Sequence, residues 1–189
     1  RMMGEMQDGF GATLTSSLTS LERGSMSAAE AALVLRECVD DLRLMMHAQD
    51  PAARDISTLL GMLRHRLQHR IQAAGVLLHW NMGELMQRQG LEPAQSLELL
   101  RILQEAITNA LRHAGARDIE IAVSQVRAQI EVQVQDNGCG FNAGSVAGGR
   151  GIRSMQTRAA RLGANLSIDS EQGASTVVIV TLPPPKRGL

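Results

Sequence analysis

Three polar residues near the middle of the chain share one face of an expected helix. Glu105, Asn109 and His113 are spaced four residues apart, which places them within an arc of roughly 80° on a helix of about 3.6 residues per turn. A carboxylate, an amide oxygen and an imidazole on one face suggest a site for a metal ion and a phosphate. The other reading is the solvated face of an amphipathic helix, and this helix alone does not choose between them.

Two glycine-rich segments follow this helix in the sequence. The first, Asp136–Gly140 (D-N-G-C-G), comes after a strand-like run, and the second, Gly148–Gly151 (G-G-R-G), opens a helix-like run over residues 152–162. Either segment alone would be a weak signal, because glycine-rich turns are common. A polar helix, then D-x-G-x-G, then G-x-G, in that order and spacing, is much more specific.

This order resembles the N box, G1 box and G2 box of the ATPase superfamily that includes Hsp90-type chaperones, DNA gyrase, mismatch-repair ATPases and sensor histidine kinases. The resemblance covers roughly residues 52–183. A Walker A phosphate loop is excluded, because the sequence G-x-x-x-x-G-K-[ST] occurs nowhere in the chain.

The resemblance implies a site for ATP and Mg²⁺. The residue matching Asp136 contacts adenine in the family, whereas the alternative here is a plain turn. Asn109 matches the magnesium ligand of the N box, and Glu105 matches its acidic position. Arg112 or His113 could neutralise phosphate charge, although a packing role for His113 is nearly as plausible.

The phosphates and the base also need close approach of the backbone, which glycine permits. Residues 141–150 are expected to form a mobile lid over the nucleotide. The segment 173–176 (G-A-S-T) resembles the G-x-G-T segment of the family, with Ser175 in place of the second glycine and Thr176 retained. The glycines expected to line the nucleotide are Gly138, Gly140, Gly149 and Gly151.

Bulk composition fits one or two soluble domains, with 189 residues, no net charge and 44% apolar content. Cys38 and Cys139 are too few for a disulfide framework, which suits a reduced, cytoplasmic compartment. One Trp, two Phe and no Tyr argue against a nucleic-acid surface. The chain starts at Arg1 inside an apparent helix, without a membrane span or signal peptide. We therefore interpret it as a cytoplasmic fragment. The resemblance to sensor histidine kinases implies a parent protein anchored in the inner membrane.

The first fifty residues predict two helices with apolar residues at steps of three and four. Gly24 can end the first helix, and Ser27 with Glu30 can form a capping box for the second. A hairpin of about 50 residues is too small to bury a stable core alone. Two hairpins are therefore expected to pair into a four-helix bundle, which makes a homodimer.

The predicted fold class is α+β, with a helical hairpin followed by a mixed sheet that helices cover on one face, the Bergerat-type sandwich of the superfamily. Asp50-Pro51 marks the boundary, because the residue before Pro is pushed out of helical geometry. The predicted domains are the dimerisation and phosphotransfer hairpin, the ATP-binding domain and a tail, at residues 1–50, 51–185 and 186–189. Expected helices in the second domain are 53–73, 94–114 and 152–162. Expected strands are 76–80, 119–123, 130–134, one beginning at 166, and 176–182, with a loop at 81–93 and a turn at 124–128.

Residues 3–11 (M-G-E-M-Q-D-G-F-G) make the resemblance closer. They look like the phosphoacceptor stretch E-[LM]-H-D-x-[LF]-G of sensor histidine kinases with short dimerisation hairpins. In that family the His takes phosphate from ATP and passes it to an Asp of a response regulator. Gln7 has the place of the His, and Asp8 has the place of the general base. A carboxamide nitrogen is not a useful nucleophile, so we predict ATP–Mg²⁺ binding without autophosphorylation at position 7.

Two explanations of Gln7 stay open: an engineered His→Gln substitution in a true kinase, and a natural pseudokinase that acts as a nucleotide-responsive dimer docking a response regulator. A third function, a Ser/Thr kinase of the anti-sigma type, fits less well because of the hairpin. Ala12 stands where related phosphatases often carry Gln, so dephosphorylation of a partner by the usual route is doubtful.

Overall fold

The computed structural model describes residues 14–28, 30–32, 34–35, 38–39, 55–83, 90–142 and 149–184. The chain divides into two compact units, Arg1–Gln49 and Asp50–Leu189, which we treat separately.

The first unit contains the predicted turn between two helical segments. Residues 14–22 are helical and helical residues resume at 28. Gly24 has a φ of 68°, a backbone conformation that glycine adopts without strain. The Ser27 amide donates to Glu30 Oε2 at 2.7 Å, and the Glu30 amide donates to Ser27 Oγ at 3.2 Å. The predicted capping box is therefore confirmed.

The second unit contains one five-stranded sheet. Its strands are β1 (Leu77–Met82), β2 (Asp118–Val126), β3 (Gln129–Asp136), β4 (Asn165–Ser170) and β5 (Thr176–Thr181), in the spatial order β1-β2-β3-β5-β4. β1 is parallel to β2, and every other neighbouring pair is antiparallel. The predicted mixed sheet is confirmed. β3 lies at its centre, so the end of β3 is surrounded by structure on both sides.

Local sequence signals explain the three helices. In α3 (Ile56–Ala73) the Asp55 carboxylate caps the first turn by accepting from the Thr58 amide at 3.1 Å. In α4 (Pro93–Asn109) proline occupies the first turn, where its missing N–H costs nothing. α6 (Arg150–Leu162) ends at Gly163, which has a φ of 70°. No helix among the described residues has both the length and the apolarity to cross a membrane.

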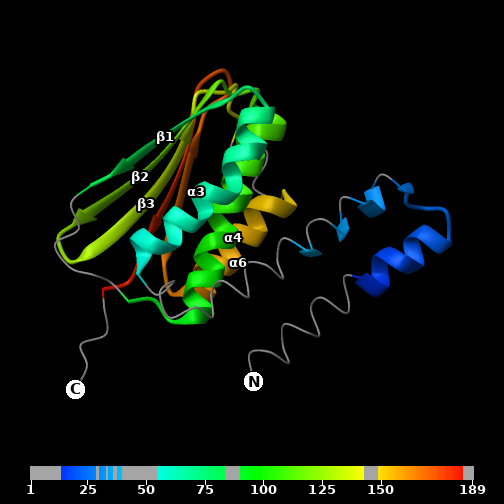
Figure 1. Ribbon diagram of the computed structural model, residues 1–189, viewed down its shortest axis with the longest axis horizontal. Coiled ribbons are helices and arrows are strands. Elements are labelled where there is room, and N and C mark those ends of the chain that lie inside the picture. The colour runs from blue at the N-terminus through cyan, green and yellow to red at the C-terminus, as the bar shows by residue number, and fades with distance from the viewer. Residues whose placement is uncertain are drawn as a thin grey trace. The chain divides into compact units, whose positions relative to one another are not determined.

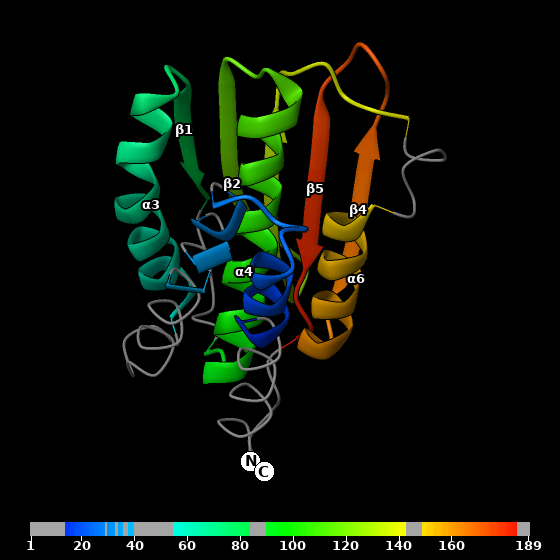
Figure 2. The same ribbon diagram turned by 90° about the vertical axis from the view of Figure 1, so that its right-hand side faces the viewer.

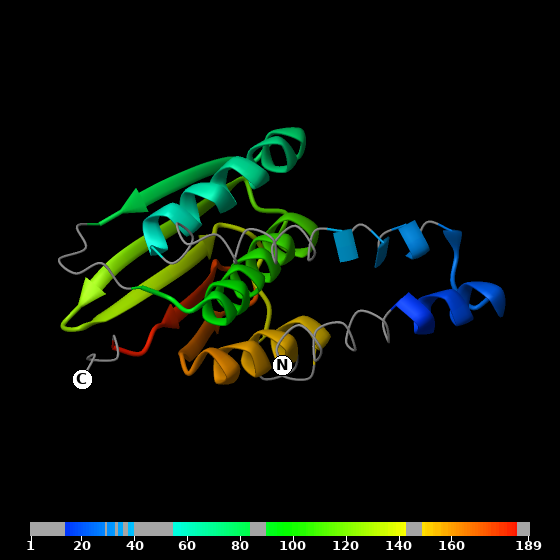
Figure 3. The same ribbon diagram turned by 60° about the horizontal axis from the view of Figure 1, so that its bottom comes forward.

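The three helices lie side by side over one face of the sheet (Figures 1 and 2). With the bottom of the Figure 1 view turned forward, α3 lies beside β1, α6 lies toward β4, and α4 runs between α3 and α6 (Figure 3). The alternating strands point Ile119, Ile121, Val132 and Val180 into the layer beneath the helices, where all four are buried. This core fixes the end of α4 near the last residue of β3, Asp136, and the first residue of β5, Thr176.

Several predicted boundaries were wrong. β1 continues to Met82 in the region predicted as a loop, because Asn81 and Met82 pair with Ala122 and Val123 of β2. The turn predicted at 124–128 is tighter, because β2 and β3 pair as far as Val126 and Gln129. α6 begins at Arg150, two residues earlier than predicted. The added ends of β1 and β2 carry exposed residues such as Met82 and Val126, so burial gives no hydrophobic pattern there.

The tight turn between β2 and β3 places Arg127 at a φ of 60°. This left-handed conformation costs a residue with a Cβ roughly 1–2 kcal/mol relative to glycine. Glycine would relieve this strain, but its greater freedom in the unfolded chain would offset part of the gain in stability. We expect Arg127→Gly to raise the free energy of unfolding by about 0.5–1 kcal/mol, measured by urea denaturation. Arg127→Ala removes the same side chain but keeps the Cβ, so it should give no such gain. Equal effects of the two substitutions would contradict the strain argument.

Candidate functional site

A cavity of about 390 Å³ opens between the end of α4, the start of α6 and strands β3, β5 and β4. Its volume lies in the range of pockets for small molecules, roughly 300–1,000 Å³. Among the described residues its polar lining comes from Asn109, His113, Asp136 and Thr176. The rest of the lining is glycine or apolar: Ala106, Ala110, Ala114, Val134, Gly140, Phe141, Gly149, Gly151, Ile152, Met155, Ile168 and Val178.

Asp136 is the buried charge of this cavity. It ends β3 with only 6% of its surface exposed. Burial raises the pKa of its carboxyl above the ordinary value, and hydrogen bonds from the Gly138 and Thr176 amides partly oppose that shift. The Gly138 amide lies 2.9 Å from Asp136 Oδ1. A buried acceptor on an apolar wall can recognise a flat ring that carries an N–H donor.

A second polar part of the site, Glu105 and Asn109, lies where the end of α4 meets the start of α6. A Cβ at Gly151 would overlap Glu105 Oε1 and would lie 3.5 Å from Asn109 Nδ2. The glycine thus lets the first turn of α6 approach the carboxylate and the amide. Glu105 does not line the cavity, whereas Asn109, Gly149 and Gly151 do.

The helix predicted over residues 94–114 is confirmed in extent, but its last turn is not α-helical. The α-helix ends at Asn109, and Ala110–Ala114 form a π-helical turn, η2. A π turn accommodates one extra residue, and such turns are frequent at functional sites. His113 still lines the cavity, while Arg112 is exposed and outside the lining. A role of Arg112 at this site stays a prediction.

The loop after β3 is held from two sides. The Cys139 amide donates to the Ala114 carbonyl at 2.8 Å, and the Gly173 amide donates to the Cys139 carbonyl at 2.7 Å. A Cβ at Gly138 would overlap the Ala114 Cβ, so glycine is required for this approach. The loop therefore joins η2 to the turn between β4 and β5.

The hydroxyl groups of Ser170 and Thr176 support Phe141, which lies farther along the loop. The Phe141 amide donates to Ser170 Oγ at 2.9 Å, and Ser170 Oγ lies 2.9 Å from Thr176 Oγ1. Phe141 lines the cavity at the base of the expected lid, and Arg150, at the far end of that lid, is the first residue of α6. Residues 143–148 of that lid, and Gln7 and Asp8 of the phosphoacceptor segment, lie outside the described residues.

Sequence reasoning missed most of the apolar lining. Ala106 and Ala110 line the cavity beside Asn109, although neither was among the predicted site residues. Their spacing of four, shared with Ala114, was the available signal, since small residues on one helix face leave room for a ligand. Ile168 and Val178 were recognised only as strand residues, because the order of β4 and β5 in the sheet is not visible in the sequence.

The arrangement can hold an aromatic base at one end and a charged, metal-bound group at the other. Mg²⁺ prefers hard oxygen ligands and keeps several waters. The Asn109 amide and the Glu105 carboxylate, together near Gly151, offer such oxygens. Among the described residues, no group of three or more His, Cys, Asp or Glu side chains could hold a metal, so phosphate oxygens and water would have to complete the coordination.

Comparison with known proteins agrees with this geometry. The family model for histidine kinase-, DNA gyrase B- and HSP90-like ATPases matches residues 94–186. The sensor histidine kinase YxjM of Bacillus subtilis is 27% identical over 97% of this chain, and the nitrate/nitrite sensor protein NarX of Escherichia coli is 34% identical over 49% of it. Residues 94–186 therefore form a domain of this ATPase family, and the chain is similar to sensor histidine kinases along most of its length.

Solved structures share the fold. The blue-light activated histidine kinase of Erythrobacter litoralis superposes with a TM-score of 0.71 at 19% identity, covering 99% of this chain and 60% of that one. Full-length ShkA, solved in complex with AMPPNP, gives a TM-score of 0.61 at 15% identity, covering 100% of this chain and 46% of that one. The chain spans 16% of the length of NarX and 47% of the length of YxjM.

Proposed function

We propose that this chain is the cytoplasmic catalytic core of a two-component sensor histidine kinase, taken from a parent protein anchored in the inner membrane. The observation that carries the proposal is the cavity, which has the buried Asp136 carboxylate at one end, where the adenine base would lie, and Asn109 at the other end. Asp136 would accept a hydrogen bond from the adenine amino group. Asn109 would bind Mg²⁺, and the amides around Gly149 and Gly151, at the N-terminus of α6, would face phosphate oxygens.

Around this site the remaining residues would position the transfer. His113 or Arg112 would offset phosphate charge, and Glu105 would order metal-bound water or assist proton transfer. In a form with His at position 7, a ring nitrogen would attack the γ-phosphorus while the bond to the β-phosphate oxygen breaks and ADP leaves. Asp8 would accept the imidazole proton. Catalysis of this kind depends on positioning and charge neutralisation.

We further propose that the chain is a homodimer that works with a response-regulator receiver domain. Apolar side chains along the first unit remain exposed in the single chain, with Leu18 and Leu35 each 56% exposed. A second hairpin packing on these residues would bury them. The further exposed apolar residues of the first unit are Leu14, Leu21 and Val39.

The test of kinase function is Gln7→His with ATP labelled at the γ-phosphate. We expect no label on the Gln7 chain and acid-labile label on Gln7→His, because an imidazole has a nucleophilic lone pair that the carboxamide lacks. The measurement is the label retained after acid or alkali treatment. Gln7→His combined with Asp136→Asn is the matched control and should stay unlabelled.

The alternatives give different outcomes. A folded Gln7→His chain that binds ATP but takes no label would favour the pseudokinase, a nucleotide-responsive dimeric module for a response regulator, and Gln7 itself is the observation in its favour. Acid-stable label would instead indicate a Ser/Thr kinase.

A further inference from the structure

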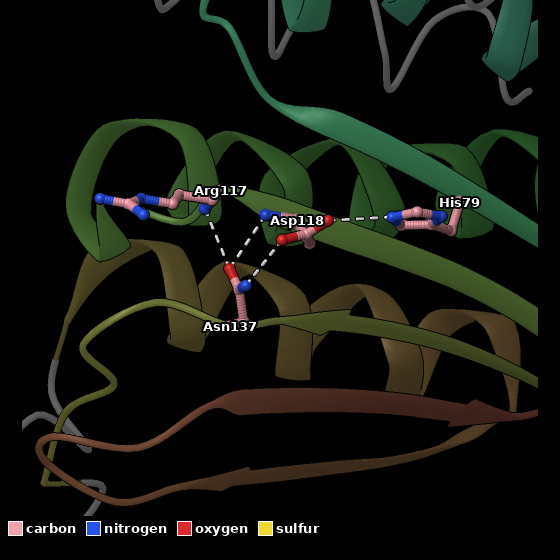
Figure 4. Close-up of polar contacts among 4 residues, drawn as sticks. All are labelled: His79, Arg117, Asp118 and Asn137. Atoms are coloured by element: carbon pink, nitrogen blue, oxygen red, sulfur yellow. Dashed lines mark hydrogen bonds and ion pairs between the residues drawn. The ribbon is translucent and has the colours of Figure 1, made fainter.

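Asn137 makes a set of hydrogen bonds that a simple turn residue does not need. Its Oδ1 accepts from the backbone amides of Arg117 and Asp118, each at 2.9 Å, and its Nδ2 donates to Asp118 Oδ2 at 2.8 Å (Figure 4). Its own amide donates to the Asp118 carbonyl at 3.2 Å. Only one orientation of the carboxamide satisfies these partners, because the oxygen faces two donors and the nitrogen faces a carboxylate.

The two segments joined by Asn137 both contribute residues to the lining of the cavity. Asn137 directly follows Asp136 and precedes Gly138. Arg117 and Asp118 come shortly after η2, which places His113 and Ala114 at the cavity. Asn137 is itself exposed and outside the cavity lining. Its side chain can therefore affect a ligand only through the residues that it holds.

Asp118 is in turn oriented by the neighbouring strand. His79 of β1 places Nε2 3.0 Å from Asp118 Oδ1, on the side away from Asn137 (Figure 4). This hydrogen bond is the main cause that holds the pKa of the Asp118 carboxyl below its ordinary value, so the group remains an acceptor at neutral pH. The His79 and Asp118 side chains are 57% and 40% exposed, and such pairs contribute little stability. The consequence is orientation: one carboxylate oxygen is left for Asn137.

We propose that Asn137 is a positioning residue for nucleotide binding, with Asp118 as its orienting partner. The side chain fixes the Asp136 carboxylate and the loop Gly138–Gly140 against the end of η2. This inference rests on the proposed function, since it concerns how the same site recognises the adenine base. Loss of the Asn137 contacts would leave the cavity present but would let the Asp136 carboxylate drift from the position that meets the base.

An exchange of the two side chains tests the proposal. Asn137→Asp keeps an acceptor for the Arg117 and Asp118 amides but sets a second carboxylate beside Asp118. Adding Asp118→Asn returns one amide donor and one carboxylate to the pair in swapped order. The measurement is the dissociation constant of Mg²⁺–AMPPNP and of its guanine counterpart by calorimetry, on the chain as it exists, with thermal unfolding followed in parallel.

We expect Asn137→Asp to weaken AMPPNP binding by about tenfold and to reduce the preference for adenine over guanine. The double substitution should return both values to within about threefold of the parent chain. Asn165→Asp, an exposed Asn on β4, is the matched control and should leave both unchanged. A merely structural role would alter the unfolding temperature without altering the ratio between the two nucleotides.

Other outcomes would overturn the proposal. If the parent chain binds AMPPNP and Asn137→Asp binds it equally well with the same base preference, the positioning role is wrong and the proposed function stands. If Asp118→Asn does not reverse the loss of binding caused by Asn137→Asp, the positioning role is likewise wrong and the proposed function stands. If Asn137→Asp does not fold, Asn137→Ala is measured instead, and parental affinity and preference in that variant refute the role. No binding by the folded parent chain would reject the proposed function and this inference together.

Discussion

Asp136→Asn is expected to weaken ATP binding by about 100-fold while the free protein stays folded. The Gly138 and Thr176 amides both donate to this side chain, so the Asn oxygen should remain turned toward them. Its NH₂ group would then face the adenine amino group, which places donor against donor in a buried site. The dissociation constant of Mg²⁺–AMPPNP, measured by calorimetry, checks the result.

Asp169→Asn is the matched control, since Asp169 is an exposed carboxylate on β4. It should leave the affinity unchanged. Asp136→Asn with the affinity of the parent chain would show that this carboxylate does not recognise the base, and would remove the main support for the nucleotide site.

The same substitution should reveal how the stability of the free chain depends on pH. Because burial raises the folded-state pKa of Asp136, the parent chain loses stability as pH rises from the unfolded-state pKa through the folded-state pKa. Because Asp136→Asn lacks this titration, its free energy of unfolding relative to that of the parent chain should be higher at pH 7 than at pH 3. Nucleotide affinity of the parent should fall as pH drops through the raised pKa. Urea denaturation and calorimetry at both pH values measure these trends.

Gly140→Ala is expected to lower the free energy of unfolding by about 3 kcal/mol or more and to abolish nucleotide binding. Gly140 has a φ of 53°, and a Cβ there would overlap the Glu171 carbonyl oxygen and lie 2.5 Å from that of Ala174. Both neighbours are backbone atoms, and the Ala174 amide already donates to the Glu171 carbonyl at 3.0 Å. The turn between β4 and β5 cannot yield without breaking its own hydrogen bonds.

Gly75→Ala separates backbone strain from this overlap. Gly75 has a φ of 67° and open space around its missing Cβ, so its substitution should cost only about 1 kcal/mol. Urea denaturation of both variants measures the difference. Equal losses at the two positions would mean that the turn of residues 171–174 yields easily, and the loop after β3 would not be rigid.

Sequence patterns predicted which helices and strands form better than they predicted where each one begins and ends. The periodicity of two in residues 119–123 and 130–134 identified β2 and β3, because one face of each strand is buried. The ends of β1 and β2 carry exposed residues such as Met82 and Val126, so hydrophobicity gives no signal there. The change from α-helix to π-helix after Asn109 is invisible for another reason, since both forms keep similar residues on one face over a single turn.

The residues of the candidate site also fall into two groups: those that sequence motifs can predict, and those whose contacts depend on the fold. Asp136 and Asn109 stand in motifs and were predicted from their neighbours in the sequence, and both line the cavity. The contacts of Asn137 with Arg117 and Asp118 join residues 19 and 20 positions apart, and the His79 contact with Asp118 spans 39 positions. Such contacts depend on which strands become neighbours, and residue types alone do not determine the strand order.

The lining of the cavity has a consequence for inhibition. Apolar side chains such as Met155, Ile168 and Val178 surround a single buried carboxylate. A small planar heterocycle with one donor aimed at Asp136 can therefore gain most of its affinity from burial alone, without phosphates and without a divalent ion.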